Sequence, residues 1–135
     1  MKSLLPIVIV LAIATAFGFW HNRSRGKVVV KADKGLITPA MIGADLGSRV
    51  TLLQFSTAFC GPCRATRLLI QDVTADMADV AHVEIDAEAN LELVRQLDIR
   101  STPTTLFLDS RGHEVGRAMG APKRDQVLNA IAAIA

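Results

Sequence analysis

The tetrapeptide Cys60-Gly61-Pro62-Cys63 is the feature that most constrains how this chain can fold. It stands between the apolar run 50–56 and a segment with helical periodicity, and it contains the only two cysteines of the 135 residues. A Cys-x-x-Cys pair at the junction of a strand and a helix is typical of redox-active thiols. The same spacing also makes half of many zinc sites, so the tetrapeptide alone leaves both chemistries open.

Hydrophobic periodicity divides the chain after residue 26 into alternating strands and helices. The expected strands cover 27–32, 49–56, 82–86, 104–108 and 113–119, and the expected helices cover 38–46, 60–77, 88–97 and 122–135. Thr38-Pro39 marks a helix start, and Gly47 marks the place where that helix should stop. Strands separated by helices predict a parallel sheet covered on both faces, and the turn 109–112 predicts a closing antiparallel hairpin.

The helices are expected to pack on the sheet through apolar stripes at spacings of three and four residues. The stripes are Leu68, Leu69, Val73 and Met77 in the second helix, Leu91, Val94 and Leu97 in the third, and Val127, Leu128, Ile131 and Ile134 in the last. In the strand 82–86, strict alternation places Val83 and Ile85 on one face.

Residues 4–20 form an uncharged apolar block of 17 residues, at the short end of what spans a bilayer. Trp20 ends the block, where an aromatic side chain suits the membrane interface, and the basic stretch 21–27 follows. We interpret the block as an uncleaved single-pass anchor. A secretory signal cleaved after Ala14-Thr15-Ala16 and a buried helix of a soluble domain are the other two interpretations.

The charges on either side of the block differ only slightly. Lys2 precedes it, whereas Arg23, Arg25 and Lys27 follow it, so the positive-inside rule leans toward a cytoplasmic C-terminal domain. A lysine before an apolar block is equally how an export signal begins. Charge therefore leaves the orientation open.

Composition and residue spacing argue against several classes of function. A net charge of +2 and an aromatic content of 4% fit neither the basic patches nor the stacking platforms of nucleic-acid-binding proteins. Zinc needs ligands besides the two cysteines, and the only histidines, His21, His82 and His113, are not at zinc-knuckle spacing. We therefore expect no metal, no bound cofactor and no nucleic acid.

Residues 27–135 resemble a thioredoxin domain. The resemblance rests on the Cys-x-x-Cys tetrapeptide between strand and helix, on Ser101-Thr102-Pro103-Thr104 before a strand, and on Gly112 and Gly120 where the family has its hairpin and late glycines. It implies an α/β thioredoxin fold, with a central mixed sheet covered by helices on both faces. The expected domains are an N-terminal transmembrane anchor with a basic linker, 1–26, and a thioredoxin-like domain, 27–135.

A thiol–disulfide exchange reaction follows from the resemblance and from the position of the cysteines. Cys60 at a helix N-terminus would have a lowered thiol pKa and would be the nucleophile, with Cys63 as the resolving thiol. Arg64 and Arg67 add positive charge nearby. The resemblance further implies that Pro103 is cis beside the sulfurs, and that the substrate contacts Phe59, Gly61, Pro62, Thr102 and Gly120.

Four residues depart from the family's usual pattern. Gln54 stands where the family has a buried Asp that takes the proton of the second cysteine, and His82 stands where it has a nearby Lys. Since an amide is no base, His82 is a candidate proton acceptor for Cys63, directly or through a water molecule. The alternative is that His82 is an ordinary strand residue. Phe59 and Ser56 replace two frequent aromatic residues, which bears on partner choice and redox potential.

The expected protein is thus a membrane-tethered thiol–disulfide oxidoreductase that reduces disulfides in partner proteins. It would be a monomer held in the membrane by residues 4–20 and recharged by an upstream electron donor. The family's habit of tethering favours an extracytoplasmic domain. Two other classes stay open: a non-catalytic binding module of the same fold, and a metal-binding or metal-delivery protein that uses Cys60 and Cys63.

Overall fold

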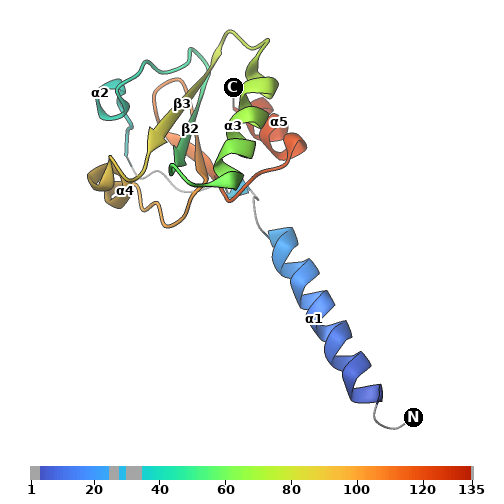
Figure 1. Ribbon diagram of the computed structural model, residues 1–135. Helices are drawn as coiled ribbons and strands as arrows, with labels where there is room; N and C mark the ends of the chain where they lie inside the picture. Colours follow the sequence, from blue (N-terminus) through green and yellow to red (C-terminus); the bar gives the residue numbers. More distant parts are fainter. Residues whose placement is uncertain (1–3, 25–27, 30–34, 135) are drawn as a thin grey trace.

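Five strands and five helices follow one another in the computed structural model, which describes residues 4–24, 28–29 and 35–134. In chain order they are α1 (Leu4–Ser24), β1 (Val28–Val29), α2 (Pro39–Ile42), β2 (Val50–Ser56), α3 (Gly61–Thr74), β3 (Val80–Asp86), α4 (Leu91–Gln96), β4 (Thr104–Leu108), β5 (Glu114–Met119) and α5 (Arg124–Ala132). The predicted order of strands and helices is confirmed. Figure 1 shows α3 and α5 on one side of the sheet and α2 and α4 on the other.

The sheet is mixed, and its strand order is β1-β5-β4-β2-β3. Among the neighbouring strands of the described residues, β2 and β3 are parallel, β4 is antiparallel to both β2 and β5, and β5 is antiparallel to β1. The expectation of parallel strands from their separation by helices is therefore wrong for β4. The connection 87–103, which contains α4, returns the chain to the end of the sheet where β3 ends, so β4 runs antiparallel to β2.

Each face of the sheet has its own core, because alternate residues of the central strands point to opposite faces. Leu53 and Phe55 of β2 pack with Leu106 under α2 and α4. Val50 and Leu52 pack on the other face, against α3 and α5. All seven residues of β2 are buried, so this strand is the centre of the domain and fixes the place where its C-terminal end meets α3.

All four helices predicted after residue 26 are shorter than expected, and the closing helix predicted over 122–135 covers only Arg124–Ala132. The helix expected over 38–46 ends at Ile42, because Gly43 adopts the left-handed conformation at φ 66° and its N–H bonds the Pro39 carbonyl oxygen. The helix α3 ends at Thr74 rather than at 77, and α4 begins at Leu91 rather than at 88.

Two of the predicted stripe residues face solvent. Leu68 and Leu91 are each 56% exposed, and the buried residues are Ile70 and Leu93 instead. The spacing of apolar residues alone could not tell these neighbours apart. In the closing segment, by contrast, Val127 and Ile131 of α5 and Ile134 just after it are buried as predicted.

Some expectations fall outside the described residues. Of the strand expected over 27–32, the structure describes only Val28–Val29, and residue 135 of the closing helix is also undescribed. Arg25, Lys27 and Lys2, which entered the charge argument, lie outside as well.

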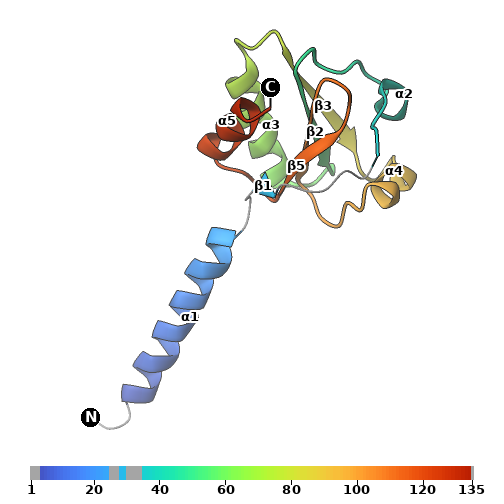
Figure 2. The ribbon, with the colours of Figure 1, turned by 180° about the vertical axis from the view of Figure 1, so that it is seen from behind.

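The helix α1 stands apart from the sheet and its covering helices (Figures 1 and 2). Its residues Leu4–His21 have a mean hydropathy of 2.1 and none of them is buried, so the segment is long and apolar enough to cross a membrane. A buried helix of the soluble domain is therefore the wrong interpretation. A membrane span and a signal sequence both fit such a helix near the N-terminus.

Candidate functional site

The two cysteines lie at the N-terminus of α3, directly after the buried strand β2. Cys60 is the N-cap residue, and its Sγ accepts a hydrogen bond of 3.1 Å from the Cys63 backbone N–H. The two residues form a disulfide, with a Cα–Cα distance of 5.2 Å. Since a helix N-terminus presents unpaired N–H groups and positive potential, the reduced Cys60 sulfur is in a place that stabilises its thiolate.

The two sulfurs differ in access to solvent. Cys60 is partly exposed, whereas Cys63 is only 1% exposed. A partner molecule can therefore reach Cys60 from solvent, and Cys63 is reached only from within the domain.

Gln54 lies beneath the disulfide and is fully buried. Its Nε2 donates to the carbonyl oxygen of Cys63 at 3.0 Å and to the hydroxyl of Ser56 at 3.0 Å. Its Oε1 is 3.0 Å from Nε2 of His82 on the neighbouring strand. Because a carbonyl oxygen only accepts hydrogen bonds, the amide nitrogen must face Cys63, and Oε1 must face the imidazole.

This network fixes the proton positions on His82. Nε2 carries a proton and donates it to Gln54, so Nδ1 is the nitrogen that can accept one. Burial lowers the pKa of the imidazole, while Glu84 raises it and Arg67 lowers it further. The structure thus brings His82 into contact with Gln54, and within the described residues no hydrogen bond joins it to a cysteine sulfur.

A second loop meets the cysteine loop at the edge of the sheet. The Thr102–Pro103 peptide bond is cis. The hydroxyls of Thr57 and Thr102 are 3.4 Å apart, and the N–H of Gly120 donates to the Pro103 carbonyl oxygen at 2.8 Å. The fold therefore brings Thr57, which follows β2, together with Thr102, and Gly120 together with Pro103.

A buried ion pair holds the segment that precedes Thr102-Pro103. Arg117 of β5 is 2% exposed, bonds both carboxylate oxygens of Glu114 at 2.5 and 2.8 Å, and donates to the carbonyl oxygens of Leu97 and Asp98. Sequence reasoning missed this pair. The available signal was the presence of two opposite charges in a strand whose neighbours on the sheet are apolar.

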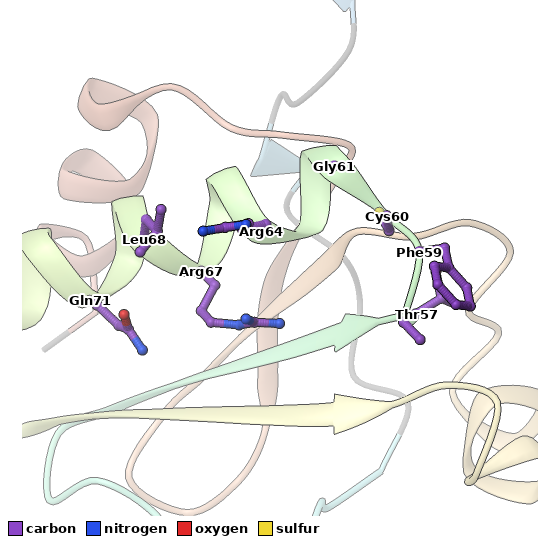
Figure 3. A pocket seen from close by; sticks show the side chains of 9 residues that line it. Thr57, Phe59, Cys60, Gly61, Arg64, Arg67, Leu68 and Gln71 are labelled. Carbon is purple, nitrogen blue, oxygen red and sulfur yellow. The ribbon is translucent and has the colours of Figure 1, made fainter.

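The surface beside Cys60 is hollowed on the α3 flank, with a volume of about 650 Å³. Figure 3 shows Arg64, Arg67 and Leu68 projecting from α3 along this hollow, with Phe59 at its end. Phe59 is fully exposed. A second, smaller and mainly apolar hollow of about 290 Å³ lies on the other side of Thr57, toward Thr102.

Within the described residues, no group of three or more His, Cys, Asp or Glu side chains could hold a metal ion. Cys60 and Cys63 instead form a pair at disulfide distance, and Cys60 is accessible to solvent.

Residues 43–133 match the family model for thioredoxin. The chain is 31% identical to "Thioredoxin H5" of Oryza sativa subsp. japonica over 102 residues, which are 76% of this chain and 75% of that protein. It is 30% identical to "Thioredoxin H2-1" of the same organism over 76 residues, which are 56% of this chain and 54% of that protein.

Among solved structures, the chain is similar to thioredoxin NaTrxh of Nicotiana alata, with a TM-score of 0.58 and 29% identity over 64% of this chain and 73% of that one. It is also similar to thioredoxin F of spinach chloroplast, with a TM-score of 0.57 and 33% identity over 64% of this chain and 71% of that one. The predicted fold is confirmed by these neighbours.

Proposed function

We propose that this chain, which belongs to the thioredoxin family, reduces disulfide bonds in partner proteins. Family membership and the Cys60–Cys63 pair make it a thiol–disulfide oxidoreductase. The direction of electron flow, the roles of single residues and the attachment to a membrane are the proposed parts.

The proposed reaction has two exchange steps. The Cys60 thiolate attacks one sulfur of the partner disulfide, so that a mixed disulfide forms and the second partner sulfur leaves as a thiolate, which takes up a proton. Cys63 then loses its proton and attacks Cys60 Sγ, which releases the first partner sulfur as a thiolate. Two electrons have passed to the partner, and the protein holds the Cys60–Cys63 disulfide.

The difference in access between the two sulfurs is the observation that carries this assignment. Only the partly exposed Cys60 lies where a protein substrate can reach it, at the positive end of a 14-residue helix. Cys63, at 1% exposure, is held for an intramolecular attack. An upstream dithiol donor would return the pair to the reduced state.

Substrate contact is proposed for the residues around Cys60, among which Pro103 is buried and Thr102 and Gly120 are partly exposed. Thr102 and Pro103 would present backbone to an extended partner segment, in the manner of strand addition, with Gly120 behind them. The remaining proposed contacts are Phe59, Gly61 and Pro62, which are all exposed.

We further propose that His82 accepts the proton of Cys63. Its Nδ1 is the nitrogen that would do so, since Nε2 already donates to Gln54. Burial, which lowers the pKa of His82, supports a neutral imidazole near pH 7.

The proposed cellular setting is a single-pass membrane protein. Residues 1–26 would form the anchor and linker, and residues 27–135 the catalytic domain, as a monomer on the extracytoplasmic side. The apolar, unburied Leu4–His21 supports a place at a membrane.

Insulin reduction by the full chain in detergent, with dithiothreitol as electron donor, tests the proposed activity. We expect turnover by the natural sequence and none by Cys60→Ser. Lack of turnover by the natural sequence would favour a non-catalytic binding module. Equilibrium dialysis of the reduced chain with Zn²⁺ or Cu⁺ tests the metal-delivery alternative, which predicts stoichiometric binding that Cys60→Ser loses.

A further inference from the structure

The hollow on the α3 flank of Cys60 carries positive charge that the chain itself does not neutralise. Its nine lining residues include Arg64 and Arg67 and no Asp or Glu. Arg67 is already paired, since its guanidinium bonds both oxygens of Glu84 at 2.5 and 2.7 Å. Arg64 is exposed and has no ion-pair partner within the described residues. The guanidinium of Arg64 is therefore available to bind a ligand.

Arg64 lies one helical turn from Cys60. Four residues of helix rise about 6 Å, which an extended partner segment covers in about two residues. The positive end of the α3 dipole acts on the same hollow, so the potential there favours negative charge. A guanidinium binds a carboxylate through two parallel hydrogen bonds, which gives the contact a preferred geometry.

Apolar side chains stand at both ends of the hollow. Phe59 is fully exposed at the end near Cys60, and Leu68 is 56% exposed farther along α3 (Figure 3). A polypeptide that crosses the hollow would cover both, and the burial of these side chains would add to its affinity. The hollow therefore fits a peptide segment better than an isolated small anion.

We propose that this hollow selects partner polypeptides that carry an acidic side chain about two to four residues from the cysteine that Cys60 attacks. The proposal rests on the proposed disulfide reduction and names the substrate class for it. Arg64 binds the partner carboxylate, and Arg67, held by Glu84, shapes the wall of the hollow.

Three synthetic peptides test this selectivity. Each is joined by one disulfide to the same uncharged peptide, and they differ only in having Glu, Gln or Lys three residues from the cysteine. The single-turnover rate of the reduced full chain is measured for each peptide by mass spectrometry. The readout is the ratio of rates between peptides, because any effect of Arg64 on the thiol pKa of Cys60 cancels in that ratio.

We expect the Glu peptide to react about two- to fivefold faster than the Gln peptide at low salt, which is the range for a solvent-exposed ion pair. The ratio should approach one in Arg64→Gln, and Arg64→Glu should prefer the Lys peptide. Arg111→Glu is the matched control, because it makes the same change of charge at an exposed arginine in the β4–β5 turn. It should keep the ratio of the natural sequence.

Equal ratios in the natural sequence and in Arg64→Gln would overturn the proposal, as would an equal change in Arg111→Glu, which would show that only net charge matters. Failure to reduce any of the three peptides would instead contradict the proposed function, and the selectivity would fall with it. Reduction of all three at one rate leaves the function intact and refutes the docking of an acidic segment.

Discussion

Gln54 is the residue that most clearly separates this site from the pattern its family suggests. Its position beneath the cysteines could be predicted by counting back along the chain, but its contacts could not. The amide donates to the Cys63 carbonyl oxygen and accepts from His82, so a neutral hydrogen-bond chain occupies the place of a carboxylate. Such a chain positions Cys63 without placing a buried negative charge beside its thiol.

The proposed proton transfer to His82 predicts a particular pH dependence of disulfide reduction. In the natural sequence the rate should rise with pH through the lowered pKa of His82, below the ordinary value of about 6.5. His82→Gln can still donate to Gln54 but cannot titrate, so the part of the rise that follows the pKa of His82 should vanish, leaving the part that follows ionisation of Cys60. The rate at pH 7 should fall at least about tenfold. Stopped-flow measurement of single-turnover reduction between pH 5 and 8 provides the check.

His82→Ala serves as the comparison because it loses both the base and the donor to Gln54. A base role predicts that the two variants behave alike. If His82→Gln keeps the pH profile of the natural sequence while His82→Ala is slower at every pH, His82 acts only by positioning Gln54.

His82→Gln should also change how the free energy of unfolding depends on pH. Burial lowers the pKa of His82 in the folded state, so below about pH 6.5 the unfolded chain binds a proton more readily than the folded one. The free energy of unfolding should therefore fall as the pH drops from about 6.5 toward the folded pKa. Denaturant titrations at pH 7 and pH 5 should show a smaller fall for His82→Gln than for the natural sequence.

At the scale of the elements, the strands could be predicted well and the helix ends poorly. The apolar run of β2 and the turn before β5 are local signals, and the structure has both where expected. The end of α2 depends on Gly43 at φ 66°, and several residues of the loop compete for that role in the sequence. The two opposite charges in β5 were a local signal for the buried pair of Arg117 and Glu114, but the bonds of Arg117 to the carbonyl oxygens of Leu97 and Asp98 are long-range contacts that no local pattern contains.

Two glycines at positive φ allow the cost of backbone strain alone to be compared with the cost of strain combined with a steric clash. Gly112 has φ 93°, and a Cβ there would lie 2.1 Å from the Ile37 carbonyl oxygen, whereas a Cβ on Gly43, at φ 66°, would meet nothing within 4 Å. Gly43→Ala should cost about 1–2 kcal/mol of unfolding free energy from strain alone. Gly112→Ala adds a clash with the backbone and should cost at least about 2 kcal/mol more. Urea titrations of both variants give the comparison, and equal losses would contradict it.

At the scale of the whole molecule, the chain joins an apolar helix to a domain whose layers, mixed sheet and closing antiparallel hairpin could be predicted. The antiparallel pairing of β4 with β2 could not. The sequence indicates helices on both faces, but whether the connection 87–103 crosses the sheet or returns to the end it left depends on how it packs, which no local pattern contains. The result is that Thr102-Pro103 reaches the edge where Cys60 lies.

The fluorescence of the single tryptophan, Trp20, should not depend on the redox state of the two cysteines. Trp20 is 69% exposed and lies on α1, a helix that stands apart from the sheet (Figure 1), so we expect no contact between its indole ring and the disulfide. Contact with a disulfide quenches indole emission, and none is expected here. Reduction with dithiothreitol should therefore leave the intrinsic fluorescence nearly unchanged in the natural sequence and in Cys60→Ser. A change limited to the natural sequence would show that α1 approaches the site.

Trapping of the mixed disulfide tests the central assignment most directly. Cys63→Ser removes the resolving thiol, so incubation of the reduced variant with a disulfide-bonded protein such as insulin should accumulate a covalent adduct. Mass spectrometry of the digested adduct should find the partner on Cys60, and Cys60→Ser should form almost none, because Cys63 is 1% exposed. An equal amount of adduct on Cys63 in Cys60→Ser, or no adduct in Cys63→Ser, would contradict the assignment of Cys60 as the nucleophile and Cys63 as the resolving thiol.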